Sequence, residues 1–174
     1  MVLTYMVLFV EGTALRAREF RAFEPRFSFQ LEPLAVAVAS SAPEPCAAAT
    51  ARVMAVTSPA FAEASDLVDA NGRSLRLEYD SEPANRFCRY YRESPATLLV
   101  ALAMRRGESV EVVRFKCDGA IAHQPRGPVE AGWECVFVPN GEKSTFAELA
   151  LAGSVATLRR DLMNRVLAYF TIAK

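Results

Sequence analysis

The hydrophobic positions of this chain alternate between short apolar runs and segments in which apolar residues recur every three or four positions. The short runs predict strands, and the helical spacing predicts helices. Strands are predicted at 3–10, 34–39, 60–63, 97–104, 110–117 and 135–138. Helices are predicted at 14–23, 46–56 and 82–92, and a C-terminal helix carries the apolar stripe Val155, Leu158, Leu162, Val166 and Phe170. This alternation predicts an α/β fold.

Turn signals divide the middle of the chain. Asn71-Gly72 predicts a turn, and Arg105-Arg106-Gly107-Glu108 predicts the loop of a hairpin between the strands at 97–104 and 110–117. The sequence shows no internal repeat and no linker-like tract. Residues 1–174 are therefore predicted to form a single domain.

Composition removes several classes of function. Lys+Arg 20 against Asp+Glu 20 leaves no basic surplus for general nucleic-acid binding. No apolar run reaches the ~18 residues that a membrane-spanning helix needs. The apolar start of the chain lacks a basic segment and a small-residue cleavage site, so a cytoplasmic location is expected, with a mitochondrial one left open.

The cysteines and the single histidine restrict the chemistry further. Cys46, Cys88, Cys117 and Cys135 form no C-x-x-C pair, so they are expected to be reduced and mostly buried. His123 lies in a turn-like stretch and is expected at the surface. A histidine-based metal site or catalytic triad is therefore excluded.

Several motifs occur in an order that resembles one enzyme family. They are Leu8 to Thr13 with Arg16, Glu19 and Phe20; Ser58-Pro59 to Glu63 with Leu67; Glu82-Pro83 with Phe87; Pro125-Arg126-Gly127; Gly132-Trp133-Glu134 with Phe137, Pro139 and Gly141; and Thr145-Phe146-Ala147-Glu148-Leu149. The block from Gly132 to Leu149 is the most specific. On these residues the chain resembles the Ham1, or inosine triphosphate pyrophosphatase, family over nearly its whole length.

The resemblance implies an elongated mixed β-sheet in two lobes flanked by helices, with a nucleotide cleft and usually a homodimer. It also implies a reaction, the Mg²⁺-assisted hydrolysis of non-canonical purine nucleoside triphosphates (ITP, XTP) to monophosphate and pyrophosphate.

Many positions that carry this chemistry in the family are substituted here. Glu63 keeps the first acid of the family's E-D pair, whereas Ala64 stands where the catalytic aspartate belongs. Glu11 and Thr13 replace the threonine and asparagine of the phosphate loop. Three further positions of the family motifs are substituted, by Ser154, Val155 and Leu158. The stretch 41–48 is left unaligned with the family.

The remaining candidate residues follow from the family positions that keep a suitable side chain. Glu63 and Glu134 are the residual catalytic candidates, and Glu63 is also a weak candidate metal ligand. The candidates for substrate binding are Arg16, Trp133, Arg159 and Arg160.

These substitutions favour a catalytically inactive protein that acts as a structural or interaction subunit of a larger assembly, with a protein partner or a second copy. No cofactor is then expected. The alternatives are a divergent Mg²⁺-dependent nucleoside triphosphate pyrophosphatase and a nucleotide sensor without turnover. The newly apolar positions Ala64, Val155 and Leu158 are expected either to fill the cleft or to form a docking surface.

Overall fold

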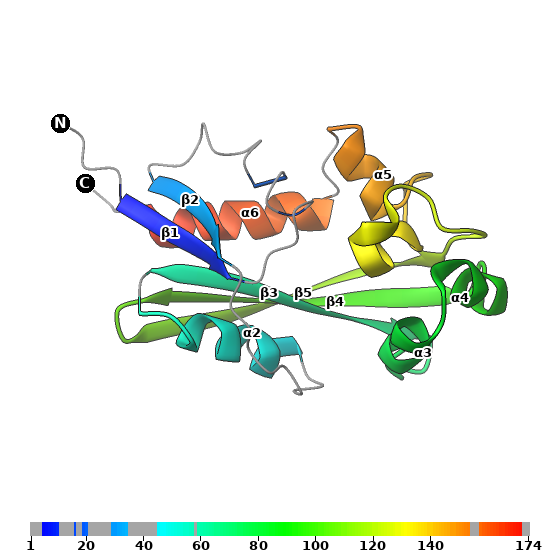
Figure 1. Ribbon diagram of the computed structural model, residues 1–174, viewed down its shortest axis with the longest axis horizontal. Helices are drawn as coiled ribbons and strands as arrows, with labels where there is room; N and C mark the ends of the chain where they lie inside the picture. Colours follow the sequence, from blue (N-terminus) through cyan, green and yellow to red (C-terminus); the bar gives the residue numbers. More distant parts are fainter. Residues whose placement is uncertain are drawn as a thin grey trace. The chain divides into compact units, whose positions relative to one another are not determined.

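A computed structural model describes residues 5–10, 16, 19–20, 29–34, 45–57, 59–153 and 157–171 (Figure 1). The elements are β1 Tyr5–Val10, β2 Phe29–Leu34, α2 Pro45–Met54, β3 Ala60–Asp69, α3 Arg76–Ser81, α4 Ala84–Tyr91, β4 Pro95–Arg106, β5 Ser109–Ile121, the 3₁₀ segment η2 Val129–Cys135, β6 Phe137–Pro139, α5 Phe146–Leu151 and α6 Thr157–Phe170. No helix in the described part of the chain is long and apolar enough to cross a membrane.

The strands form one mixed sheet in the order β2-β1-β3-β4-β5-β6. β1 pairs in parallel with both β2 and β3, whereas β5 and β6 are antiparallel. The predicted α/β fold class is therefore confirmed. The chain divides into two compact units: the first comprises Met1–Ala64, Val100–Phe115 and Arg159–Lys174, and the second comprises Ser65–Leu99 and Lys116–Leu158.

The sheet of the first unit has two chemically different faces. Under α2, small side chains of the helix and the strands form an apolar cluster of Val10, Ala48, Ala49, Val53, Ala60, Ala62, Ala64, Ala101 and Ala103. The opposite face is aromatic, because Phe61 stacks on Phe9 at 4.8 Å between ring centroids and meets Phe170 of α6 at 6.3 Å. Successive side chains of a strand point to opposite faces, which separates Phe61 and Glu63 from their alanine neighbours. Figure 1 shows α2 and α6 on opposite sides of these strands.

Two predicted strands differ from the observed ones. β2 ends at Leu34, where the predicted strand begins, and the rest of the prediction falls on residues outside the described ones. Pro33 obscured this strand in the sequence, although proline is tolerated here because β2 is the edge strand of the sheet. β3 extends to Asp69, six residues beyond the predicted end, through polar positions such as Ser65 and Asp66.

The other predicted elements are found with small shifts. The described part of the N-terminal strand is β1, and α2, α4 and the hairpin of β4 and β5 lie close to their predicted bounds. Asn71-Gly72 forms its turn, with Gly72 at φ 79°. The predicted helix at 14–23 is described only at Arg16, Glu19 and Phe20, which are helical. Of the predicted C-terminal stripe, Val155 lies outside the described residues and the other four members are buried in α6.

Two of the recognised motifs meet in the second unit. Thr145 caps α5: its hydroxyl accepts the Glu148 N–H at 3.2 Å, and the Glu148 carboxylate accepts the Thr145 N–H at 2.9 Å. The same hydroxyl donates to the carbonyl of Arg126 at 2.9 Å. Gly127 adopts φ 89°, and a Cβ there would lie 2.7 Å from the Cβ of Ala147. These motifs therefore hold α5 in place and need not serve catalysis.

Thr145→Ala is expected to lower the free energy of unfolding by about 0.5–2 kcal/mol, the usual effect of losing an N-cap. Thr145 is fully buried, so a donor and an acceptor lose their partner inside the protein. Urea denaturation would measure this, with the half-buried neighbour Ser144→Ala as the control. Equal stability of the two variants would contradict the structural role assigned to this motif.

Candidate functional site

Glu63 of β3 is the centre of a charged cluster in the first unit. Its two carboxylate oxygens accept hydrogen bonds from one guanidinium: Arg16 Nε reaches Oε2 at 2.9 Å, and the second Arg16 nitrogen reaches Oε1 at 2.5 Å. Arg159 of α6 also donates to Oε2, at 3.2 Å. Arg16 and Arg159 are exposed by only 4% and 2%, so these ion pairs are shielded from water. The structure thus brings together three of the residues that the sequence nominated.

The local fold explains why these groups converge. Glu63 follows Phe61 by two positions on β3, so its side chain lies on the aromatic face, on the same side as α6. Arg16 belongs to the described helical residues that pack Phe20 on Phe9, and its guanidinium lies 5.0 Å from the centre of the Phe20 ring. The Arg16 side chain is therefore held by two interactions at once, the cation–π contact with Phe20 and the ion pair with Glu63.

Two further residues complete the cluster, and the sequence did not nominate either for a role there. Glu19 forms an ion pair with Arg16 three positions earlier in the chain. Arg52 of α2 donates to the backbone carbonyl of Glu63. The i, i+3 spacing of Arg16 and Glu19 in the sequence could have predicted their ion pair. The contact between Arg52 and Glu63 could not be predicted in this way, because it depends on how α2 packs on β3.

The pKa of the Glu63 carboxyl lies below its ordinary value. Burial raises the pKa, but the charges of Arg16 and Arg159, the hydrogen bond from Arg16 and the charge of Arg52 together outweigh burial. Glu63 is therefore ionised at neutral pH.

This pKa shift predicts a pH dependence of stability. A carboxyl whose pKa is lowered by folding stabilises the protein above its unfolded pKa, here near 4.5, and this contribution is lost as the pH falls through the folded pKa. The difference in unfolding free energy between wild type and Glu63→Gln should therefore be constant near neutral pH and shrink as the pH falls below about 4.5. Glu111→Gln, which removes the partner of Arg165 in an exposed pair, is the control. A difference that does not change with pH would contradict the ionised cluster.

Ala64 is buried in the apolar cluster under α2, on the other face of β3 from Glu63. Asp66, two residues further, accepts a hydrogen bond from Ser74 at 2.7 Å and belongs to the second unit. Neither position therefore supplies a second acid beside Glu63. Of the two outcomes expected for Ala64, the structure shows packing inside the protein.

The other sequence candidates are distributed as follows. Trp133 and Glu134 belong to the second unit, where the indole N–H of Trp133 donates to Ser65 at 3.0 Å and Glu134 is buried. Arg160 is exposed on α6. Glu11, Thr13, Ser154 and Val155 lie outside the described residues. The roles of all these positions in binding stay predictions.

The described residues do not fit a resident Mg²⁺ ion. Mg²⁺ prefers free carboxylate oxygens, whereas both oxygens of Glu63 already accept bonds from guanidiniums. Within the described part of the chain, no group of three acidic, histidine or cysteine side chains is placed to hold a metal ion. The weak metal role predicted for Glu63 would require the arginines to move.

The structure gives the burial of the four cysteines and of His123. None of the four cysteines, all of which lie in the described part of the chain, forms a disulfide; Cys88 and Cys135 are buried, whereas Cys46 and Cys117 are half-buried. His123 is exposed, 2.8 Å from the carboxylate of Glu93.

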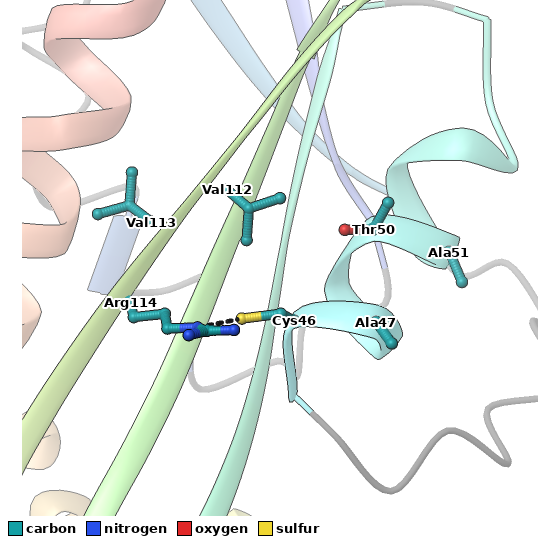
Figure 2. Close-up of a pocket in the computed structure, with 7 residues that line it drawn as sticks. All are labelled: Cys46, Ala47, Thr50, Ala51, Val112, Val113 and Arg114. Atoms are coloured by element: carbon teal, nitrogen blue, oxygen red, sulfur yellow. Dashed lines mark hydrogen bonds between the residues drawn. The ribbon is translucent and has the colours of Figure 1, made fainter.

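A separate shallow pocket lies in the first unit between α2 and β5 (Figure 2). Its apolar wall comes from residues such as Ala47, Ala51 and Val112, and Arg114 donates to the sulfur of Cys46 at 2.9 Å. None of the candidate residues lines it. The pocket is therefore distinct from the Glu63 cluster.

Comparison with known proteins identifies the family. The model of the Ham1 family matches residues 48–160. The chain belongs to the Ham1 family. Its segments resemble the dITP/XTP pyrophosphatase of Pyrobaculum aerophilum, with 43% identity over 54 residues, 31% of this chain and 29% of that protein. For the dITP/XTP pyrophosphatase of Ignicoccus hospitalis the identity is 30% over 74 residues, 42% of this chain and 37% of that protein. This chain thus spans well under half of the length of these relatives.

Solved Ham1 structures share the fold over nearly the whole chain. A HAM1 protein from Coxiella burnetii aligns with a TM-score of 0.68 at 16% identity, covering 98% of this chain and 100% of that chain. The Staphylococcus aureus Ham1 protein aligns with a TM-score of 0.61 at 14% identity, covering 94% and 97%. At this low identity the likeness establishes the fold, and this chain is a divergent member of the Ham1 family.

Proposed function

We propose that this chain is a Ham1-type nucleoside triphosphate pyrophosphatase of strongly reduced rate, which converts non-canonical purine triphosphates to monophosphate and pyrophosphate. Family membership and the names of its dITP/XTP pyrophosphatase relatives support the reaction class. The observation that carries the proposal is the convergence of Arg16 and Arg159 on one position of β3. Arg16 stands where the family resemblance puts a phosphate-binding lysine.

The chemistry that this cluster supplies is charge neutralisation. A triphosphate concentrates negative charge, and guanidinium groups meet phosphate oxygens through two parallel hydrogen bonds. Fixed positive charge in a shielded site stabilises the charge that develops when a phosphoryl bond breaks. The aspartate to which the family resemblance assigns the chemistry of the attacking water is replaced by Ala64, which lies in the apolar cluster. Loss of one acid–base group lowers a rate by about 10²–10⁴, so turnover should be slow.

Pyrophosphate release from ITP, XTP and ATP with Mg²⁺ tests this proposal. Slow, saturable release from ITP or XTP is expected for the wild type, and Arg16→Gln should abolish it. Arg165→Gln, which removes an exposed arginine of α6 outside the cluster, should leave the rate unchanged. Release at the same rate from the wild type and Arg16→Gln would contradict the proposal.

The second candidate is the non-catalytic subunit that the substitutions favour. It is supported by the engagement of both Glu63 oxygens with arginines and by the burial of Ala64 at the position where the family resemblance puts the catalytic aspartate. Absence of pyrophosphate release would support it. Saturable nucleotide binding without release would then indicate a sensor, and absence of both would favour a protein partner or a second copy. The cytoplasmic location stays a prediction.

A further inference from the structure

The Glu63 cluster brings two buried guanidiniums onto one carboxylate. Arg16 and Arg159 both form ion pairs with Glu63. Burying guanidiniums is unfavourable unless anionic oxygens accept their hydrogen bonds. Glu63 provides these oxygens to two arginines at once.

The geometry of these contacts is the geometry of oxyanion recognition. Arg16 donates hydrogen bonds to both carboxylate oxygens of Glu63, at 2.9 Å to Oε2 and 2.5 Å to Oε1. Arg159 donates a third hydrogen bond to Oε2 at 3.2 Å. The oxygens of a phosphate group are also negatively charged, so they can accept hydrogen bonds from the same guanidinium donors. The donors are already held in place, because Arg16 lies over the Phe20 ring and Arg159 is buried.

We propose that the Glu63 carboxylate is an internal counter-anion, which occupies the arginine cluster in the free protein and competes with a phosphate-type polyanion for Arg16 and Arg159. The proposal rests on the proposed function, since it concerns the same arginines. It gives Glu63 a regulatory role: a ligand binds only by displacing the carboxylate. Glu63 thereby lowers the affinity of the site for polyanions.

The competition predicts a gain of affinity when the carboxylate is neutralised. Inorganic pyrophosphate is the probe, because it carries the ligand chemistry without a base or a sugar. Its dissociation constant would be measured by calorimetry on the full chain, without divalent cations, for wild type and for Glu63→Gln. We expect Glu63→Gln to bind pyrophosphate at least about tenfold more tightly, because fewer charge-assisted hydrogen bonds have to be broken before the ligand can bind. The double variant Glu63→Gln/Arg159→Gln should lose most of this gain.

Glu111→Gln is the matched control, because it also removes one negative charge from a glutamate–arginine pair of the first unit, outside the cluster. Equal or weaker pyrophosphate binding by Glu63→Gln than by wild type would overturn the proposal, as would an equal gain in Glu111→Gln. If Glu63→Gln does not fold alone, millimolar pyrophosphate should restore a cooperative thermal transition, and failure to do so would also overturn it. These binding measurements do not depend on turnover. A failure of the proposed function, seen as no pyrophosphate release, can therefore be told apart from a failure of the competition, seen as no gain in pyrophosphate affinity.

Discussion

Replacing Arg159 with alanine is expected to lower the free energy of unfolding by about 2–5 kcal/mol, the usual effect of truncating a large buried side chain, here together with a charge-assisted hydrogen bond. Arg159 is only 2% exposed and donates to the carboxylate of Glu63. Its loss leaves a carboxylate largely enclosed by protein with fewer donors, and it removes the aliphatic stem from the packing of α6.

Urea denaturation followed by circular dichroism would measure this effect. The control is Arg160→Ala, the next residue of the same helix, whose side chain is exposed. Its effect should stay within about 1 kcal/mol, the usual upper limit for an exposed charged side chain and its partner. Similar losses in the two variants would mean that the cluster around Glu63 does not stabilise the first unit in the way described.

Ala64→Asp is expected to destabilise the protein by about 3 kcal/mol or more and to leave pyrophosphate release unimproved, because it buries a charge without a partner. By sequence alone this change restores the acid pair of the family. In the structure, however, the side chain at position 64 packs among alanines and valines under α2. The new carboxylate would therefore point away from Glu63.

Ala64→Asn is the matched control, because it introduces nearly the same volume without the charge. It should destabilise less than the aspartate, and neither variant should gain activity. Thermal unfolding and the pyrophosphate-release assay would be run on both proteins. A stable Ala64→Asp protein with clearly faster release would contradict the placement of this position inside the apolar cluster.

Much of the fold followed from the sequence because periodicity reports burial. The buried stripe Leu158, Leu162, Val166 and Phe170 gave the terminal helix, and turn residues gave the hairpin. Strand β2 was predicted too far along the chain, because a proline such as Pro33 normally interrupts a strand. Proline is tolerated at the edge of a sheet, and only the structure shows that β2 lies there. β3 was predicted too short because Ser65 and Asp66 are polar, although Ser65 and Asp66 have partners in Trp133 and Ser74.

The candidate site was predicted in part, for a different reason. Motif positions identified Arg16, Glu63 and Arg159, and the structure brings these three together. Arg52 was missed because it reaches Glu63 only through the packing of α2, and no local spacing reports such a contact. The structure was also needed to show on which face of β3 Ala64 lies. The motif shows that an alanine replaces the acid, but it does not show where that side chain packs.

The most direct test of the central claim, that a purine triphosphate binds at the arginine cluster, is calorimetric titration of the full chain with XTP. Saturable binding is expected for the wild type and for Arg165→Gln, with at least about tenfold weaker binding for Arg16→Gln, because one charge-assisted contact contributes about 1.5–3 kcal/mol. Absence of XTP binding by the wild type, or equal affinity in Arg16→Gln with its fold intact, would contradict the account.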